Sequence, residues 1–109
     1  MADRAIKKND TWPPLEAVLM DQNGPINLTT ATSVKFLMRG TKRKNPFSTS
    51  GTCTVVDAPK GEVVFFWSPT NTSVADTYQG EFEISWADGS VGTVPNSGYL
   101  YVLVFDDLG

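Results

Sequence analysis

Short runs of alternating apolar and polar residues, each closed by turn residues, constrain this chain more than any other feature. The longest run covers residues 77–86. Its apolar residues share one face: Tyr78, Phe82, Ile84 and Trp86. Because successive side chains of a β-strand point to opposite faces, such alternation predicts strands with one buried face. No window carries a sustained helical period with capping residues. The chain is therefore predicted to be all-β.

The predicted strands follow one another closely, and turn residues separate them. Asn23-Gly24 and Asp88-Gly89 are dipeptides typical of tight hairpins, and residues 58–61 form a further compact turn. Residues 40–50 are expected to form a flexible loop or an irregular edge. The strands are expected at residues 15–20, 33–39, 52–56, 62–67, 77–86, 91–94 and 99–105, with a brief extension at 26–28. About seven antiparallel strands favour an immunoglobulin-like two-sheet sandwich over a closed barrel.

A chain of 109 residues is expected to form one domain. We interpret residues 1–13 as an N-terminal arm and residues 14–109 as the β-sandwich domain. Pro13-Pro14 suits the entry to an edge strand, since proline cannot donate to a ladder. The run 62–67 is apolar on both faces and is expected to be central or partly covered. Cys53 is the sole cysteine, so no intrachain disulfide forms, and we interpret it as a small buried strand residue rather than a nucleophile.

The spacing of Asp76 and Tyr78 allows two interpretations. An Asp two residues before a Tyr, at the start of a late strand, is compatible with the tyrosine corner of Greek-key sandwiches, whose hydroxyl bonds back to the main chain. The alternative is a tyrosine that only packs in the core. The sequence leaves both interpretations open.

Residues that carry catalysis are scarce. The sequence holds no histidine, which removes Ser–His and Cys–His pairs and most zinc sites. Glu81 and Glu83 lie on one strand face about 7 Å apart, as in an inverting glycosidase pair, but a solvated face lacks the apolar setting that raises a catalytic pKa. Neither Asp106-Asp107 nor Asp88-Gly89 matches the calcium-loop spacing. The chain is therefore expected to be no enzyme and to hold no metal or cofactor.

Charge is divided unequally along the chain. Residues 1–60 hold all nine basic residues and five of the twelve acidic residues, so every charged side chain in residues 61–109 is acidic. This asymmetry indicates contacts between copies through a basic and an acidic edge. The alternative, which remains open, is that strands of the two halves interleave and disperse the asymmetry.

The basic residues gather at Lys42, Arg43 and Lys44, with Lys35 and Arg39 nearby. The acidity of the chain and the lack of interleaved aromatic residues argue against a nucleic-acid partner, so the tripeptide is interpreted as a solvated or protein-contacting loop. No run reaches the ~20 apolar residues of a membrane helix, and no hydrophobic stretch follows the basic N-terminal residues as in a secretory signal. We therefore expect no membrane partner and synthesis in the cytoplasm.

Three tryptophans and several other aromatic residues are candidates for either core or contact. Trp67 and Trp86 fall on inward phases and are expected in the core. Trp12 lies in the arm, where it docks on a neighbouring subunit or folds back on its own domain. The candidates for an open aromatic face that binds a host-surface glycan are Phe66, Tyr99 and Tyr101.

A series of motifs resembles a known family. The most specific are Gly80-Glu81-Phe82-Glu83, Ala87-Asp88-Gly89, Thr93-Val94-Pro95-Asn96 and Gly98-Tyr99, in that order. The others are Ile6-Lys7-Lys8-Asn9-Asp10-Thr11 with Pro14-Leu15, residues 21–24 with Ile26-Asn27-Leu28-Thr29, Val34-Lys35-Phe36-Leu37-Met38-Arg39, Gly61-Glu62-Val63 with Trp67, Asp76-Thr77-Tyr78-Gln79, and Ile84. Together they resemble the N-terminal immunoglobulin-like domain of the phage baseplate upper protein family, over most of the chain.

This resemblance implies a virion structural protein of the tail or baseplate region, assembled in the host cytoplasm. It implies multiple copies in a symmetric assembly, held by contacts with other virion proteins. We expect Trp12, Lys42, Arg43 and Lys44 at such contacts. Longer family members continue into helical or fibre-holding segments, whereas this sequence ends at Gly109. A head or neck decoration protein, or a carbohydrate-binding module for host adhesion, is the alternative.

Overall fold

The structure, a computed structural model, describes residues 3–42, 44–45, 48–106 and 108. These residues form strands, turns and bends and no helix, which confirms the all-β prediction. None of this part of the chain is a helix that could cross a membrane. The strands are β1 (Arg4–Lys7), β2 (Leu15–Val18), β3 (Met20–Asp21), β4 (Gly24–Pro25), β5 (Ala31–Gly40), β6 (Ser48–Thr52), β7 (Thr54–Asp57), β8 (Glu62–Phe65), β9 (Asp76–Trp86), β10 (Val91–Val94) and β11 (Leu100–Phe105).

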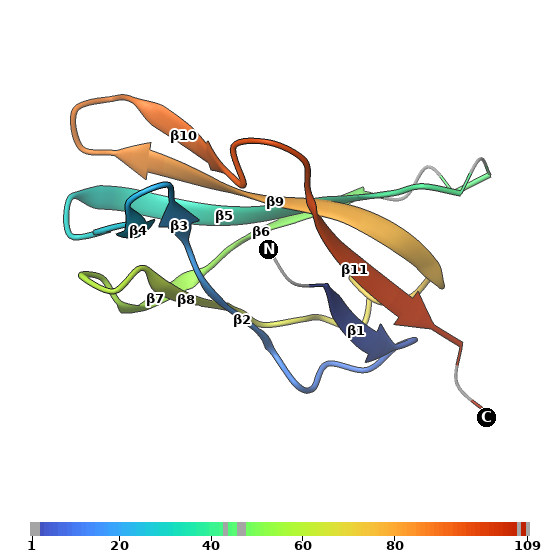
Figure 1. The fold of residues 1–109 in the computed structure, drawn as a ribbon. Coiled ribbons are helices and arrows are strands. Elements are labelled where there is room, and N and C mark those ends of the chain that lie inside the picture. Colours follow the sequence, from blue (N-terminus) through green and yellow to red (C-terminus); the bar gives the residue numbers. More distant parts are fainter. Residues whose placement is uncertain (1–2, 43, 46–47, 107, 109) are drawn as a thin grey trace.

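The first sheet has six strands, of which β10, β9 and β5 lie uppermost in Figure 1, while β11 descends to the edge strand β1 at the lower right. Its order is β1-β11-β9-β5-β6, and β10 pairs with the second half of β9. The long strand β9 pairs antiparallel with both β5 and β11. At the edge, β1 runs parallel to β11. The residues assigned to an N-terminal arm thus contribute a strand to this sheet.

The second sheet has three strands in the order β2-β8-β7 and lies below the first (Figure 1). As expected for a run that is apolar on both faces, β8 is the central strand and pairs antiparallel with both neighbours. The short strands β3 and β4 form a separate hairpin at the predicted turn. Gln22 and Asn23 connect the strands, and Gly24, with φ +109°, begins β4. The two sheets give the chain a two-layered, sandwich-like form.

A shared hydrophobic core lies between the layers. The predicted alternation is observed: Val34, Phe36 and Met38 of β5 are buried, while Lys35 and Arg39 are exposed. The inward residues of β9 are also buried, except Trp86, which is half-buried. Rings from both sheets meet at the centre. The Phe36 ring lies 5.1 Å from Phe82 and 5.2 Å from Phe65 between centroids, both tilted at 48°, and 6.0 Å from Trp67 in an edge-on contact. These separations fall in the range that interacting aromatic rings prefer.

The chain changes sheet at Cys53, where the sequence predicted one continuous strand. Residues 48–52 form β6 on the first sheet, so strand structure extends into the segment expected as a loop. The N–H of Cys53 donates to the Val34 carbonyl at 2.8 Å, and residues 54–57 then pair with β8 of the second sheet. Cys53 is buried at the crossing, as predicted. The predicted extension at 26–28 is not a strand, because its N–H groups bond to carbonyls of Leu19 and Ala58 outside any ladder.

Tyr78 does more than pack in the core. Its side chain is fully buried, and its Oη donates a hydrogen bond to the Val74 carbonyl at 2.6 Å. This bond joins the start of β9 to the main chain four residues upstream, as in a tyrosine corner.

Strands from the two halves of the sequence alternate in space. In the first sheet β9 and β11, from the acidic half, lie between β1 and β5, from the basic half. In the second sheet β8 lies between β2 and β7. Lys35 faces Glu83 directly across β5 and β9. The strands of the two halves therefore interleave. The charge asymmetry along the sequence does not produce one basic and one acidic edge in the folded chain.

Candidate functional site

The outer face of the second sheet carries a group of exposed apolar side chains. Period two turns Val63 and Phe65 of β8 into the core, which leaves Val64 and Phe66 on the outward side, although Val64 is itself covered and only 7% exposed. Phe66 is 65% exposed. Val18 and Pro14 from the β2 side and Val56 from β7 complete the lining of a depression of about 430 Å³. We call Pro14, Val18, Val56, Val64 and Phe66 the apolar face.

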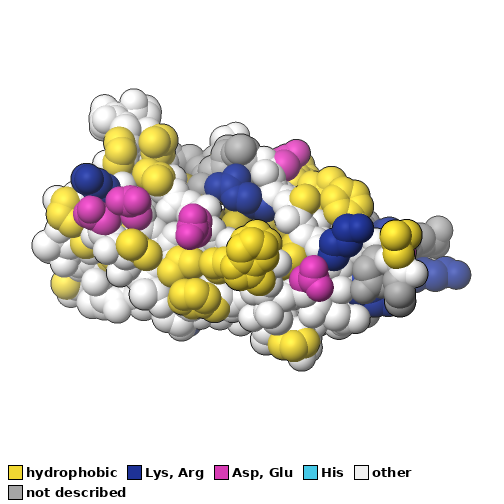
Figure 2. All heavy atoms as spheres, turned by 90° about the horizontal axis from the view of Figure 1, so that it is seen from below, with side chains coloured by type: hydrophobic (Ala, Val, Ile, Leu, Met, Phe, Trp, Pro, Cys, Tyr) yellow, Lys and Arg dark blue, Asp and Glu magenta, His cyan; other side chains and the backbone are white. Residues whose placement is uncertain are grey.

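Charged residues surround the apolar face. Arg4, Glu16 and Glu62 also line the depression, and an Nη2 hydrogen bond from Arg4 to the Glu16 carbonyl at 3.0 Å links β1 to β2. Seen from below, hydrophobic side chains gather near the middle of the molecule with basic and acidic groups around them (Figure 2). A clustered apolar surface of this kind marks an interaction site more often than scattered apolar residues do.

Trp12 extends the exposed apolar surface near the entry to β2. Its side chain is 78% exposed, so it does not fold back into its own domain. The preceding turn is anchored, because Thr72 Oγ1 donates to the Asp10 carbonyl at 2.8 Å and the Asn9 N–H donates to the Thr72 carbonyl at 2.9 Å. Trp12 is therefore presented from a fixed point of the domain. Trp67, by contrast, is buried as predicted.

The basic tripeptide lies in the loop after β5, far along the chain from Trp12. Lys42 and Lys44 are exposed, and Arg43 lies outside the described residues. Lys42 Nζ donates to the Ala75 carbonyl at 3.1 Å. Lys42 and the turn before Trp12 are both held by residues 72–75, because Lys42 bonds to Ala75 while Asn9 and Asp10 bond to Thr72. Among the described residues, no hydrogen bond joins Lys42 or Lys44 to Trp12 itself.

Asp76 holds the start of this loop through hydrogen bonds. Its buried carboxylate accepts hydrogen bonds from the Thr41, Lys42 and Thr77 N–H groups, the Asn45 side-chain amide and the Thr41 hydroxyl. Burial raises the pKa of Asp76, but the hydrogen bonds from Lys42, Asn45, Thr77 and Thr41 outweigh it and lower the pKa below its ordinary value. Asp76 is thus a charged acceptor that holds Thr41, Lys42 and Asn45 in place.

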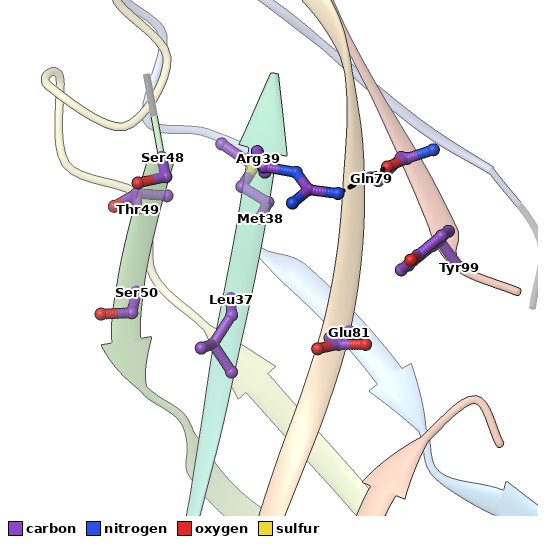
Figure 3. A pocket seen from close by; sticks show the side chains of 9 residues that line it. All are labelled: Leu37, Met38, Arg39, Ser48, Thr49, Ser50, Gln79, Glu81 and Tyr99. Atoms are coloured by element: carbon purple, nitrogen blue, oxygen red, sulfur yellow. Dashed lines mark hydrogen bonds between the residues drawn. The ribbon is translucent and has the colours of Figure 1, made fainter. Parts of the chain in front are cut away.

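A second depression, with a volume of about 390 Å³, lies on the outer face of the first sheet (Figure 3). Register places the outward residues of β6, β5 and β9 in two rows, and Tyr99, just before β11, stands at the other side. In one row are Ser48, Arg39 and Gln79; in the other are Ser50, Leu37 and Glu81. Arg39 reaches from β5 over β9 toward Gln79, and Nη2 and Oε1 are 3.5 Å apart. We call this feature the polar groove.

The remaining candidates of the sequence occupy separate places. Glu81 and Glu83 both point outward from β9 and are half-buried. Burial raises the pKa of the Cys53 thiol to about 12, so the thiolate is disfavoured. Within the described ranges, no three metal-binding side chains gather. Tyr99 and Tyr101 are exposed on the first sheet, whereas Phe66 lies on the second, so the three glycan candidates do not share a face.

In comparisons with known proteins, the sequence matches no family model and no curated protein.

Neither depression was expected as a unit from the sequence. The apolar pattern of residues 62–67 contained a signal for the first, because a central strand with two apolar faces in a two-layered protein exposes one of them. The polar groove had no such signal. It depends on the register between strands that lie far apart in the sequence.

Proposed function

We propose that the chain is an immunoglobulin-like structural module of a bacteriophage particle, placed in the tail or baseplate region and held by protein–protein contacts. Three features of the structure support the immunoglobulin-like fold. The sheet β2-β8-β7 faces the sheet β1-β11-β9-β5-β6, β1 runs parallel to β11, and Tyr78 makes a corner-type bond to Val74. The motif resemblance described above supports the virion setting.

The apolar face is the observation that carries the proposal. Phe66 is 65% exposed and Val56 is 64% exposed, and both stand beside Val18 on one rigid sheet. An aromatic residue surrounded by aliphatic ones, with charged residues at the rim, is the usual anatomy of a protein–protein contact. A neighbouring virion protein that covers this face would remove the apolar surface from water, and repetition around a symmetric particle would let weak contacts add.

Trp12 is expected to join this contact, and the loop with Lys42 and Lys44 is expected to form a second one. The apolar face is formed by residues of β2, β8 and β7 and the positions next to them, whereas the loop follows β5 of the other sheet. A module that bridges two neighbours in an assembly needs two contact surfaces of this kind. The basic loop suits an acidic neighbour, since charge complementarity sets orientation and association rate.

The experiment is incorporation into particles. Phage carrying Phe66→Ser or Trp12→Ala would be purified, and the copies of the chain per particle measured by quantitative mass spectrometry. Both variants should lower incorporation, and reversal of charge at Lys42 and Lys44 should lower it through the second contact. Phe105→Ser is the matched control, because Phe105 is 48% exposed on the other sheet. Its incorporation should be unchanged.

Two outcomes would overturn the proposal. One is absence of the wild-type chain from purified particles. The other is normal incorporation of all contact variants. A cryo-EM map of the particle distinguishes the positions: density at the tail tip supports the baseplate region, and density on the capsid or neck assigns the chain to the alternative role of a head or neck decoration protein.

A further inference from the structure

The polar groove combines an exposed aromatic ring with hydrogen-bonding side chains that are largely unused. Tyr99 is 39% exposed at one side of the groove, and Arg39, Gln79 and Glu81 line its floor (Figure 3). We propose that this groove binds a neutral saccharide, with a sugar ring stacked on Tyr99 and its hydroxyl groups bonded by Arg39, Gln79 and Glu81.

The groove is built on rigid structure. Arg39 belongs to β5, and Gln79 and Glu81 belong to β9, the central strand of the first sheet. The pairs Arg39–Gln79 and Leu37–Glu81 are direct partners in the β5–β9 ladder, so the register holds their side chains side by side. A site on paired strands needs little ordering when a ligand binds, which lowers the entropic cost of binding.

The hydrogen-bonding capacity of the lining fits a hydroxyl-rich ligand. Arg39 offers only donors, Glu81 only acceptors, and Gln79 offers both. Within the described part of the chain, Arg39 makes one long hydrogen bond, with 3.5 Å between its Nη2 and Gln79 Oε1. No described side chain donates a hydrogen bond to Glu81. A sugar hydroxyl donates and accepts at once, so neighbouring hydroxyls can satisfy Arg39 and Glu81 together. Ser48 and Ser50 extend the polar lining on the far side.

The aromatic side of the groove fits the carbon face of a sugar. The Tyr99 ring offers a flat apolar surface, and the C–H groups of a pyranose present a matching one. Tyr101, 38% exposed, pairs with Gln79 across β11 and β9. Tyr101 lies on β11 two residues after Tyr99, beside the row that contains Gln79. An extended oligosaccharide can contact both.

Charge and hydrogen-bond type argue against other ligands. Arg39 and Glu81 balance each other, and beyond the groove Lys35 faces Glu83. This face therefore has no excess of positive charge to favour an anionic sugar or a phosphate. A proline-rich peptide would stack on the tyrosines, but its backbone has few donors. Such a peptide would remove water from Glu81 without replacing the lost hydrogen bonds, which is costly for a carboxylate.

The test is binding of the full chain to defined neutral glycans. Maltohexaose, cellohexaose and chitohexaose would be titrated into isotope-labelled protein and followed by NMR, alongside an array of neutral oligosaccharides of glucose, galactose, mannose, rhamnose and N-acetylhexosamines. A decaproline peptide and a sialylated glycan are the comparison ligands. At least one neutral glycan should bind and shift the amide signals of β9 and of residues 99–101.

Variants tie the binding to the groove. Tyr99→Ala should weaken it by about tenfold or more, as expected for the loss of a central aromatic contact, and Tyr99→Phe should retain most of it. Glu81→Ala should also weaken it. Phe66→Ala is the matched control, because its exposed ring lies on the opposite sheet, and it should bind as wild type. Thermal unfolding of each variant identifies any that fail to fold, in which case Arg39→Ala replaces it.

The inference is overturned if no neutral glycan binds, if Tyr99→Ala and Glu81→Ala bind as well as wild type, or if Phe66→Ala abolishes binding. Binding of decaproline or of the sialylated glycan alone would also overturn it. None of these results depends on whether the chain is part of a virion, so the inference and the proposed function fail independently.

Discussion

The buried carboxylate of Asp76 accepts a hydrogen bond from the main-chain N–H of Lys42, with 3.0 Å between Oδ2 and the nitrogen. The Thr41 N–H and the Asn45 amide bond to the same oxygen. One acid at the start of β9 therefore holds the beginning of the basic loop, 34 residues earlier in the sequence. The geometry of a surface loop depends here on a single buried charge.

Replacement of this acid should loosen the loop and destabilise the fold. In Asp76→Asn one carboxylate oxygen becomes an amide that faces hydrogen-bond donors, so we expect a loss of about 1–3 kcal/mol in the free energy of unfolding. Chemical denaturation measures the loss, and hydrogen exchange should increase at residues 41–45. Asp88→Asn is the control, because Asp88 bonds only to Ser90 at an exposed turn. A smaller effect from Asp76→Asn than from Asp88→Asn would contradict this role.

Stability should also depend on pH through Asp76. Its pKa is lowered in the folded chain, so the unfolded chain binds a proton more readily, and stability rises with pH in this range. The contribution is complete above the unfolded value of about 3.9 and is lost as the pH falls through the lowered folded value. Wild type should lose more stability than Asp76→Asn between about pH 4 and pH 2. Equal slopes for the two proteins in pH-dependent denaturation would refute the linkage.

The bond between Tyr78 and Val74 should contribute measurably to stability. Tyr78→Phe retains the buried ring but leaves the Val74 carbonyl without its donor, which we expect to cost about 1–3 kcal/mol. Urea unfolding measures the difference. Tyr101→Phe removes a hydroxyl from an exposed tyrosine and should stay within about 0.5 kcal/mol of wild type. If Tyr78→Phe also leaves the free energy of unfolding unchanged, the bond from Tyr78 to Val74 does not contribute to stability.

Alanine substitutions at two glycines should distinguish the effect of backbone strain on stability from the effect of steric contact. Gly61 has φ +68°, and a Cβ there would lie 2.7 Å from the Leu19 carbonyl oxygen and 2.8 Å from that of Ile26. Gly89 has φ +90° with nothing within 4 Å. Both alanine variants strain the left-handed backbone, but only Gly61→Ala also displaces backbone. We expect Gly61→Ala to be less stable than Gly89→Ala by about 1–3 kcal/mol, as measured by thermal unfolding. The reverse order would contradict the packing at the β7–β8 turn.

The thiol of Cys53 should be unreactive in the folded protein. It is buried, and burial raises its pKa to about 12, while the thiolate is the reactive form. At pH 8 an Ellman reagent should modify the native chain only as fast as it unfolds, and it should modify the denatured chain at once. Rapid stoichiometric modification of the native chain would show that the crossing between the sheets opens readily.

Much of the fold was accessible from local patterns. Alternation in residues 77–86 and 33–39 identified the two longest strands and their inward faces, because a strand has a period of two that burial imprints on the sequence. The Asn23-Gly24 and Asp88-Gly89 turns were found for a similar reason, since positive φ favours glycine. The double-faced apolar run at 62–67 correctly indicated a central strand. Trp12 and Lys42, which were expected at protein contacts, are exposed, and their role in such contacts stays a prediction.

Other features of the fold depend on strand pairing between segments that are distant in the sequence, so only the tertiary structure decided them. The split of residues 48–57 into β6 and β7 follows from which sheet each half joins, and nothing local marks Cys53 as the crossing point. The cancellation of the charge asymmetry needs β9 beside β5. The polar groove needs Arg39 in register with Gln79, and the apolar face needs β2, β8 and β7 side by side. By itself the sequence determined the all-β class, the two longest strands with most of their inward residues, and the turns that contain Gly24 and Gly89, because these depend on a residue and its near neighbours. The strands β1 and β6 were recognised only in the structure. Register and sheet order determined both candidate sites, because they arise from contacts that no local pattern records.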